Sequence, residues 1–331
     1  MSKARVVSGM RPTGRLHLGH LVGALRNWTD LQDRYECFYF VADWHALTSE
    51  YADARTIAPN ALDNVADWIA AGLDPERSTL FIQSLVPEHA ELFLLLSMVV
   101  PVPWLERVPT YKEQQELLRD RDLSTYGFLG YPLLQTADVV IYDARYVPVG
   151  EDQVAHLELS REVVRRFNNF FGPVFVEPQP ILSRVPRLPG LDGNRKMSKS
   201  LGNTIELSDD ADTVRRKVMR MYTDPKRVRA DIPGTVEGNP VFTYHDAFNP
   251  NTAEVEELKA RYRAGRVGDV EVKERLAAAL NAMLEPMRER RAQALARPGY
   301  LREVLVEGSR RARAVATETM ARVRAAVGLT Y

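Results

Sequence analysis

The sequence predicts an α/β protein with a Rossmann-type parallel-sheet domain over residues 1–205, followed by an all-helical domain over residues 206–331. Short apolar runs alternate with helical segments in the first part, which is the pattern of a parallel sheet with crossover helices. A glycine-containing turn after the first run opens directly into an amphipathic helix, as in nucleotide-binding folds. Beyond Ile205 only helical periodicity remains, so we place the domain boundary there.

The composition is that of a globular protein without a membrane segment. The chain has 331 residues, of which 45% are hydrophobic, enough for one large or two smaller cores. It contains no apolar run of about eighteen residues, the length of a membrane span, and Met1 to Arg5 lack a signal-peptide pattern. We therefore expect a cytoplasmic protein. A single cysteine, Cys37, and six scattered histidines predict neither an internal disulfide nor a metal site.

Charge is balanced over the whole chain but not locally. The formal net charge of zero argues against a generally basic coat for nucleic acid. Residues 285–324 nevertheless hold ten arginines against five glutamates, and residues 215–229 hold a second basic cluster. Such stripes either neutralise RNA phosphates or form solvated helix faces, and the sequence leaves both possibilities open.

The individual elements follow from apolar spacing and from turn residues. Residues 18–32 and 55–72 predict amphipathic helices, the second of which ends at Gly72. The apolar helix expected over 92–100 is buried either in a subunit contact or in the protein's own core. Strands are expected over 6–8, 38–42, 79–83 and 139–142, and later helices over 210–222, 253–262, 270–290 and 300–327, with linkers at Pro225, Pro233 and Pro240.

The first chemical motif is the turn His17-Leu18-Gly19-His20, which follows Pro12-Thr13-Gly14. Both histidines fall where a helix begins, and a helix N-terminus presents unpaired N–H groups to phosphate oxygens. Gly19 has no side chain, so a nucleotide can lie directly on the backbone. Two surface histidines at a helix start would give the same pattern.

The second motif is Lys196-Met197-Ser198-Lys199-Ser200, flanked by Gly190, Gly193 and Gly202 in a predicted loop. Two lysines three residues apart suit the negative charge that develops on a leaving pyrophosphate. A solvated basic turn is the alternative interpretation.

Polar residues also gather around the fourth predicted strand. Tyr131, Gln135 and Asp138 share one face of a predicted helix, and a buried carboxylate without a partner is costly, so this face predicts a pocket. His45 follows the second strand at its carboxyl end, where parallel sheets bind ligands, although it also fits the edge of a core. Gly150-Glu151-Asp152-Gln153 begins the next helix and is either a binding turn or an ordinary helix cap.

Together the two motifs resemble the HIGH and KMSKS signatures of class I aminoacyl-tRNA synthetases. Over nearly its full length the chain is similar to the bacterial type of the tryptophanyl branch. The resemblance implies ATP-dependent ligation of L-tryptophan to tRNA(Trp) through a tryptophanyl-adenylate, with release of AMP and pyrophosphate and with Mg²⁺ bound together with ATP. It also implies a homodimer, an anticodon-binding helical domain and a last helix that packs back on the catalytic domain.

The same resemblance implies a role for individual residues in catalysis and in tryptophan binding. Asp138 would read the indole N–H, Tyr131 and Gln153 would hold the ammonium group, and Val7 and His45 would line the pocket together with Gln135. The residues implied in phosphate chemistry are His17, His20, Lys112, Lys196 and Lys199.

The ATP site implied by the resemblance combines the first turn, the Gly150 segment and the second motif. Its residues are Arg11, Pro12, Thr13, Gly19, His20, Gly150, Glu151, Asp152, Leu188, Lys196, Met197, Ser198, Lys199 and Ser200.

The chain departs from the family pattern at two positions. Arg11 stands where glutamine is usual, and Gln135 stands where methionine is usual. The second change also fits tyrosyl-tRNA synthetases, which makes tyrosine the alternative substrate. Two other classes fit parts of the pattern. One is a synthetase-like module that binds RNA or protein without catalysis, and the other is a small-molecule adenylyltransferase, which needs no long helical tail.

Overall fold

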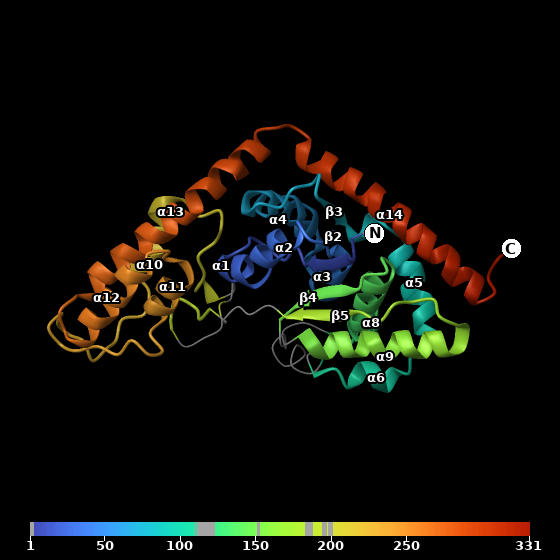
Figure 1. Cartoon of the computed structure of the whole chain (residues 1–331), viewed down its shortest axis with the longest axis horizontal. Coiled ribbons are helices and arrows are strands. Elements are labelled where there is room, and N and C mark those ends of the chain that lie inside the picture. Colours follow the sequence, from blue (N-terminus) through green and yellow to red (C-terminus); the bar gives the residue numbers. More distant parts are fainter. Residues whose placement is uncertain are drawn as a thin grey trace. The chain divides into compact units, whose positions relative to one another are not determined.

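The computed structural model divides the chain into two compact units (Figure 1). It describes residues 3–109, 111, 123–150, 153–182, 188–193, 197 and 201–331. Unit 1 comprises Met1–Gly14, Ala24–Arg184 and Ala294–Tyr331, and unit 2 comprises Arg15–Gly23 and Val185–Gln293.

This division into compact units differs from the single boundary predicted at residue 205. The segment after Gly14 joins unit 2 because it pairs with the chain around Ile205. Leu18 N–H donates to the Ile205 carbonyl at 3.0 Å, and Leu207 N–H donates to the Leu16 carbonyl at 2.9 Å. The last 38 residues, Ala294–Tyr331, belong instead to unit 1.

Unit 1 is built on one five-stranded parallel sheet with the order β3-β2-β1-β4-β5. The central strand β1 pairs through Val7 with Phe38 of β2, and Phe38 pairs with Thr79 of β3. Parallel neighbours require crossover connections, and helices supply most of them here. The Rossmann-type prediction is confirmed. The strands are β1 (Arg5–Met10), β2 (Glu36–Val41), β3 (Ser78–Ile82), β4 (Tyr146–Val149) and β5 (Gln179–Leu182).

The strand predicted over residues 139–142 is wrong. Residues 139 and 140 belong to helix α8 (Tyr126–Val140), and residues 141 and 142 lie in the turn that follows it, where the Ile141 N–H still donates to the Ala137 carbonyl at 3.1 Å. A short apolar run looks the same in a buried helix end and in a buried strand, so the pattern could not separate them. The strands that complete the sheet, β4 and β5, each contain a proline and were not predicted.

The two long helices predicted in the first part are confirmed with small changes. Helix α4 ends at Gly72, whose φ of 112° is the left-handed conformation typical of helix C-caps. The helix predicted over 18–32 contains one π-helical turn. The helical segments of this part are α1 (Leu18–His20), η1 (Leu21–Leu25), α2 (Arg26–Leu31), α3 (Asp43–Glu50), η2 (Tyr51–Thr56), α4 (Ile57–Ala71), η3 (Gln83–Leu85), α5 (Glu88–Ser97), α6 (Val102–Glu106), α8 and α9 (Val154–Phe171).

Unit 2 is mainly helical, and one of its helices was not predicted. Pro240 was interpreted as a linker, but it begins helix α11, where a proline leaves no helical donor unpaired. Asn239 caps this helix by accepting the Val241 N–H at 3.0 Å. The helices here are α10 (Ala211–Met219), α11 (Pro240–Phe248), α12 (Thr252–Arg263) and α13 (Asp269–Leu295).

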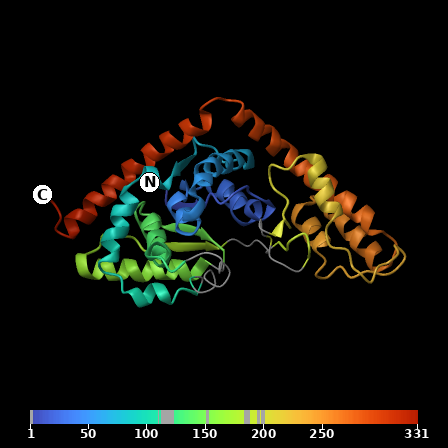
Figure 2. The ribbon, with the colours of Figure 1, turned by 180° about the vertical axis from the view of Figure 1, so that it is seen from behind.

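The last helix, α14 (Tyr300–Ala326), packs within unit 1 against β3 and α5, as Figures 1 and 2 show. Ser309 Oγ accepts the Ile82 N–H at 3.2 Å. The arginines of this helix form ion pairs with unit 1, Arg313 with Glu88 at 2.8 Å and Arg324 with Glu91 at 2.6 Å. Some arginines of the basic stretch 285–324 therefore help to hold α14 on the sheet of unit 1.

Arg288, in unit 2, is also committed to the fold. Its Nε donates to the Asp209 carbonyl at 2.9 Å, and its Nη atoms bind Glu285 at 2.7 Å and Asn281 at 2.6 Å. A charge change at Arg288 would break these contacts, so it is a poor probe of RNA binding.

No helix in the described part of the chain is both long and apolar enough to cross a membrane.

Gly308 allows the contact between α14 and β3, and its replacement tests this packing. A Cβ atom at Gly308 would lie 1.8 Å from the Leu80 carbonyl oxygen, whereas one at the exposed, helical Gly127 meets nothing within 4 Å. We predict that Gly308→Ala lowers the free energy of unfolding by about 2 kcal/mol or more, because the helix must move away. Urea unfolding measures the change. Gly127→Ala should cost nothing, and equal stability of the two variants would contradict the packing.

Candidate functional site

A buried carboxylate, that of Asp138 on helix α8, forms the centre of the site in unit 1. Its side chain is 1% exposed. Oδ1 accepts hydrogen bonds from Gln83 Nε2 at 2.8 Å and from His89 Nδ1 at 2.6 Å. Oδ2 accepts one from His45 Nε2 at 2.7 Å. The sequence prediction of a polar, pocket-forming face on this helix thus coincides with a dense polar network.

The network keeps Asp138 ionised. Burial alone would raise the pKa of Asp138, but the electrostatic attraction and hydrogen bond of His45, together with those of His89, lower it to about 2. An ionised carboxylate can only accept, so all three partners donate to it. The result is a fixed negative charge in the core at neutral pH.

The partners of Asp138 come from the carboxyl ends of two neighbouring strands, where doubly wound sheets bind their ligands. His45 lies on α3 just after β2, and Gln83 directly follows β3. These two ends are tied together, because Ser84 N–H donates to Asp43 Oδ1 at 3.1 Å and the Ser84 hydroxyl donates to Oδ2. The Asp43–Ser84 hydrogen bonds thus hold together the two strand ends that carry these donors.

Asp138 retains capacity for one more donor. A carboxylate offers about four acceptor positions, two on each oxygen. Within the described part of the chain, Oδ1 accepts two hydrogen bonds and Oδ2 accepts one. The remaining position is on Oδ2, and it suits an N–H or O–H group.

The other residues expected around tryptophan are placed in unit 1 as well. Gln135 Oε1 accepts a hydrogen bond from His156 Nδ1 at 3.0 Å, and the centre of the Tyr131 ring lies 5.6 Å from that of the His156 ring. Val7 is fully buried in β1, within the apolar core. Gln153 occupies the N-cap position of α9, and its backbone N–H donates to the Gly150 carbonyl at 3.0 Å.

In unit 2, the two histidines of the first motif cap the helix that they begin. His17 Nδ1 accepts the Gly19 N–H at 3.1 Å, and His20 Nδ1 accepts the His17 N–H at 3.1 Å. A nitrogen that accepts from a backbone N–H carries no proton, so the neutral rings carry theirs on Nε2. The motif therefore presents two imidazole N–H donors of fixed tautomer.

Gly19 is the residue of the first motif that lies against the second motif. A Cβ atom there would lie 2.8 Å from His17 Cε1 and 3.3 Å from the Met197 sulfur. The second motif thus comes close to the first through Met197, which is buried, as is Leu188.

Some of the expected ATP-binding residues lie in unit 1. Arg11 Nη1 donates to Ser49 Oγ at 3.4 Å, and Thr13 N–H donates to the Arg11 carbonyl at 2.9 Å, with buried Pro12 between them. Seven predicted site residues lie outside the described part of the chain, namely Lys112, Glu151, Asp152, Lys196, Ser198, Lys199 and Ser200.

Sequence reasoning missed three members of the Asp138 network. Gln83 had a usable signal, because it ends a strand at the carboxyl edge of the sheet. His89 and Tyr142 had none, since their contact depends on how α5 packs against the end of α8. His156, the partner of Gln135, lies in the first turn of α9. The sequence predicted it only as part of that helix.

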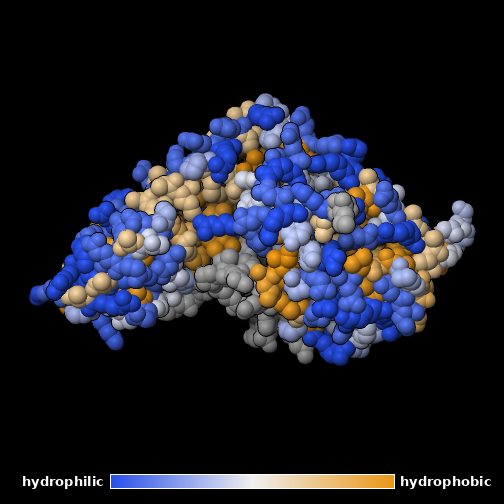
Figure 3. Space-filling model, viewed as in Figure 1, coloured by the Kyte–Doolittle hydropathy of each residue, from blue (hydrophilic) through white to orange (hydrophobic). Residues whose placement is uncertain are grey.

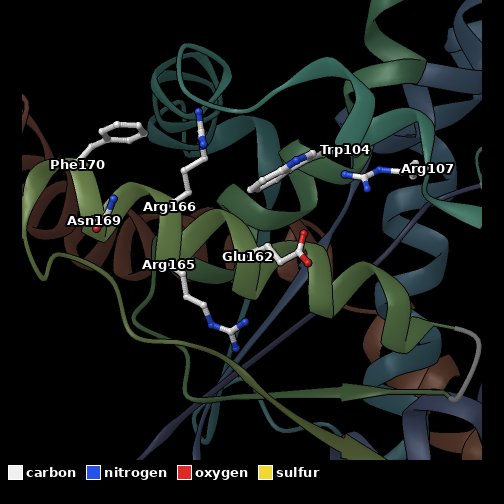
Figure 4. A pocket seen from close by; sticks show the side chains of 7 residues that line it. All are labelled: Trp104, Arg107, Glu162, Arg165, Arg166, Asn169 and Phe170. Carbon is white, nitrogen blue, oxygen red and sulfur yellow. The ribbon is translucent and has the colours of Figure 1, made fainter.

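A hollow of about 600 Å³ lies elsewhere on unit 1, and no expected site residue lines it. Figure 4 shows Arg166 between two aromatic rings; its guanidinium carbon lies 5.6 Å from the Trp104 ring centre and 5.0 Å from that of Phe170. Its lining residues are Trp104, Arg107, Glu162, Arg165, Arg166, Asn169 and Phe170.

Comparison with known proteins agrees with this arrangement. Residues 1–285 match the family described as tRNA synthetases class I (W and Y). The tryptophan–tRNA ligase of Treponema pallidum is 54% identical over 98% of this chain and 97% of its own length, and that of Thermotoga maritima is 51% identical over 99% and 100%.

The fold leads to the same family. The crystal structure of tryptophanyl-tRNA synthetase from Campylobacter jejuni complexed with ADP and tryptophan superimposes with a TM-score of 0.88 and 32% identity, covering 98% of this chain and 100% of that one. The parallel sheet, the paired signature motifs and these relatives lead to one conclusion. The chain belongs to the class I aminoacyl-tRNA synthetases, in the bacterial type of their tryptophanyl branch.

Proposed function

We propose that the protein ligates L-tryptophan to tRNA(Trp) at the expense of ATP. Tryptophan and ATP form tryptophanyl-adenylate and pyrophosphate, and the adenylate then acylates the tRNA with release of AMP. The family membership supports the reaction, and the open acceptor position on the buried carboxylate of Asp138 supports the amino acid. That acceptor is the observation on which the proposal chiefly depends.

The chemistry of activation requires positioning and charge stabilisation rather than a general base. The tryptophan carboxylate is already ionised and attacks the α-phosphorus of ATP directly, while pyrophosphate departs. The Nε2–H donors of His17 and His20 suit phosphate oxygens, and Mg²⁺ enters with ATP as the counter-ion of its phosphates. Lys112, Lys196 and Lys199 would neutralise the charge that develops on the leaving group.

The remaining ATP contacts stay as the family resemblance implies them. The residues that the resemblance implies in ATP binding belong to the first turn, to the Gly150 segment and to the second motif. They include Arg11, Pro12, Thr13, Gly19, Gly150, Glu151, Asp152, Leu188, Met197, Ser198 and Ser200.

Tryptophan recognition depends on matching one donor to one buried acceptor. The indole nitrogen only donates, and Asp138 Oδ2 has a position that only accepts. Phenylalanine would leave that position empty, which is costly in a buried site. Tyrosine also donates, and its exclusion would depend on pocket shape, to which Val7, His45 and Gln135 contribute.

The mainly helical unit 2 would bind the anticodon region of tRNA(Trp). Its basic cluster over 215–229 is partly engaged in the fold, because Arg227 lies over the Tyr262 ring and pairs with Asp269 at 3.0 Å. The tRNA contact would therefore come from cations other than Arg227 and Arg288.

We further propose that the protein is a homodimer in the cytoplasm. Three apolar side chains in one stretch of the chain are exposed. They are Leu94 on α5 by 53%, Met98 directly after α5 by 70%, and Val102 on α6 by 52%. Figure 3 shows hydrophobic surface in the region of α5. Exposed apolar surface of this kind favours a subunit contact. Sedimentation at micromolar concentration tests the dimer.

Amino-acid-dependent exchange of pyrophosphate into ATP tests the proposed reaction directly. With each amino acid supplied in turn, tryptophan should support exchange far better than tyrosine or phenylalanine. Preference for tyrosine would overturn the substrate, and absence of exchange with any amino acid would leave a binding module without catalysis.

The two lysines of the second motif provide the first test of mechanism. Lys196→Ala or Lys199→Ala should slow adenylate formation by about a hundredfold or more, since each removes roughly 3 kcal/mol of charge stabilisation in the transition state. Rapid-quench kinetics measures the step. The exposed Lys226 serves as control, and Lys226→Ala should retain the wild-type rate. A wild-type burst in Lys199→Ala would exclude its proposed role.

Gly19 tests the first motif. Its replacement by Ala should displace the His17 ring, because the new Cβ would lie 2.8 Å from it, and misplacement by about 1 Å costs roughly a hundredfold in rate. The same change at Gly23, one turn later in the same helical stretch, meets nothing within 4 Å. Pyrophosphate exchange should fall in Gly19→Ala and persist in Gly23→Ala. Equal rates would show that His17 needs no fixed position.

Asp138 tests the choice of amino acid. Sites built around one required hydrogen bond reject the analogue that lacks it by about ten-thousandfold. Asp138→Asn still accepts through its amide oxygen and should weaken tryptophan activation less than Asp138→Ala does. Steady-state activation of tryptophan, tyrosine and phenylalanine measures the effect. If Asp138→Ala activates tryptophan like the wild type, Asp138 is not the determinant.

A further inference from the structure

We infer that His89, which does not contact the expected substrate groups, is a positioning residue for Asp138 and thereby determines selectivity for an amino acid with an aromatic N–H. This inference rests on the proposed role of Asp138. His89 is fully buried on α5 and has a partner on each ring nitrogen. Nδ1 lies 2.6 Å from Asp138 Oδ1, and Nε2 lies 2.6 Å from the Tyr142 hydroxyl.

The direction of the hydrogen bond to Asp138 follows from the chemistry of the carboxylate. An ionised carboxylate only accepts, so Nδ1 of His89 donates to Asp138. Burial raises the pKa of Tyr142 well above its ordinary value, so its hydroxyl keeps its proton beside Nε2. A continuous hydrogen-bonded chain therefore joins Tyr142, His89 and Asp138 Oδ1.

This chain fixes which oxygen faces a ligand. His89 and Gln83 together occupy both positions of Oδ1, so rotation of the carboxyl group would break two hydrogen bonds. Only Oδ2 keeps an open position. Outer partners of this kind set the orientation and basicity of a binding group without contacting the ligand.

His89 is better placed for this task than the other donors to Asp138. The Gln83 carbonyl oxygen is buried and has no partner within the described residues, so only one end of that amide is held. His45 is the donor that shares Oδ2 with the expected substrate. The His89 ring is anchored at both ends, between α5 and the residue two positions after α8.

The charged and titratable surroundings of Asp138 are few. His45 faces it from α3, His89 from α5, and Tyr142 lies behind His89. Glu88, next to His89, turns to α14, where its Oε1 binds Arg313 at 2.8 Å and Thr317 at 3.3 Å. Loss of the His89 donor would leave His45 and Gln83 as the only side chains stabilising the charge, among those described.

The experiment compares tryptophan with its isostere 3-benzothienylalanine, in which sulfur replaces the indole N–H. His89→Phe keeps a ring but removes both hydrogen bonds, and His89→Asn keeps a donor near the Nδ1 position. We expect His89→Phe to lower the preference for tryptophan over the isostere by about tenfold to a hundredfold, mainly through a higher KM for tryptophan. His89→Asn should recover most of the preference.

The pH profile adds a readout that a purely structural role would not change. A lost donor to the ionised form raises the pKa of Asp138, so in His89→Phe the KM for tryptophan should begin to rise at a higher pH than in the wild type as the pH is lowered. In the wild type the KM should stay flat, because the pKa of Asp138 is about 2. His245→Phe removes another buried, hydrogen-bonded histidine, in unit 2, and should change neither readout.

Parallel measurements on Asp138→Ala, which removes the acceptor, separate the two proposals. If Asp138→Ala keeps the wild-type preference, the proposed role of Asp138 fails and the inference falls with it. If Asp138→Ala loses the preference while His89→Phe keeps it with a flat profile, the role of Asp138 stands and the inference on His89 is overturned. Should His89→Phe not fold, Tyr142→Phe decides. Tyr142→Phe removes the hydroxyl that contacts His89 Nε2. If this variant keeps the wild-type preference for tryptophan over the isostere, the inference is overturned.

Discussion

The burial of one negative charge, that of Asp138, constrains much of unit 1. A carboxylate that is 1% exposed is tolerated only when donors surround it, because an uncompensated buried charge costs several kcal/mol. The donors arrive from three elements, α3, the end of β3 and α5. Those elements must therefore meet at the carboxyl edge of the sheet, which is where parallel sheets place their ligands.

The C-terminal helix, α14, helps to fix α5, the helix that carries His89 to the Asp138 carboxylate. Arg313 and Arg324 of α14 bind Glu88 and Glu91, which flank His89 on α5. The helix can lie this close to β3 because Gly308 has no side chain against the Leu80 carbonyl. Residues more than 200 positions apart in sequence therefore fix the element that carries His89. Surface ion pairs contribute little each, so the packing of the helix carries most of this support.

Periodicity and turn residues were sufficient to predict the parts of the fold with long, regular signals. They predicted the parallel sheet domain, the helices ending at Gly72 and beginning at Leu18, and the shared face of Tyr131 and Asp138. They failed where the signal was short or ambiguous. The run over 139–142 fits a strand and a helix end equally well, and β4 and β5 are four residues long.

The site was predictable only in part, for a physical reason. Asp138 could be identified because its own helix is otherwise apolar, so the cost of burying it is visible in the sequence. The partners of Asp138 could not be identified from the sequence. The contacts of His89 and Tyr142 arise from tertiary packing between elements that are distant in sequence. The compact units differ from the single boundary predicted at residue 205 for the same reason, since the pairing of Leu18 with Ile205 is a long-range contact.

A crystal structure of the protein with tryptophan bound would show whether Asp138 binds the indole. We predict that the indole nitrogen lies about 3 Å from Asp138 Oδ2, while Gln83 and His89 keep their hydrogen bonds to Oδ1. An indole nitrogen that faces another acceptor, or an Oδ1 that has exchanged His89 for the ligand, would contradict it.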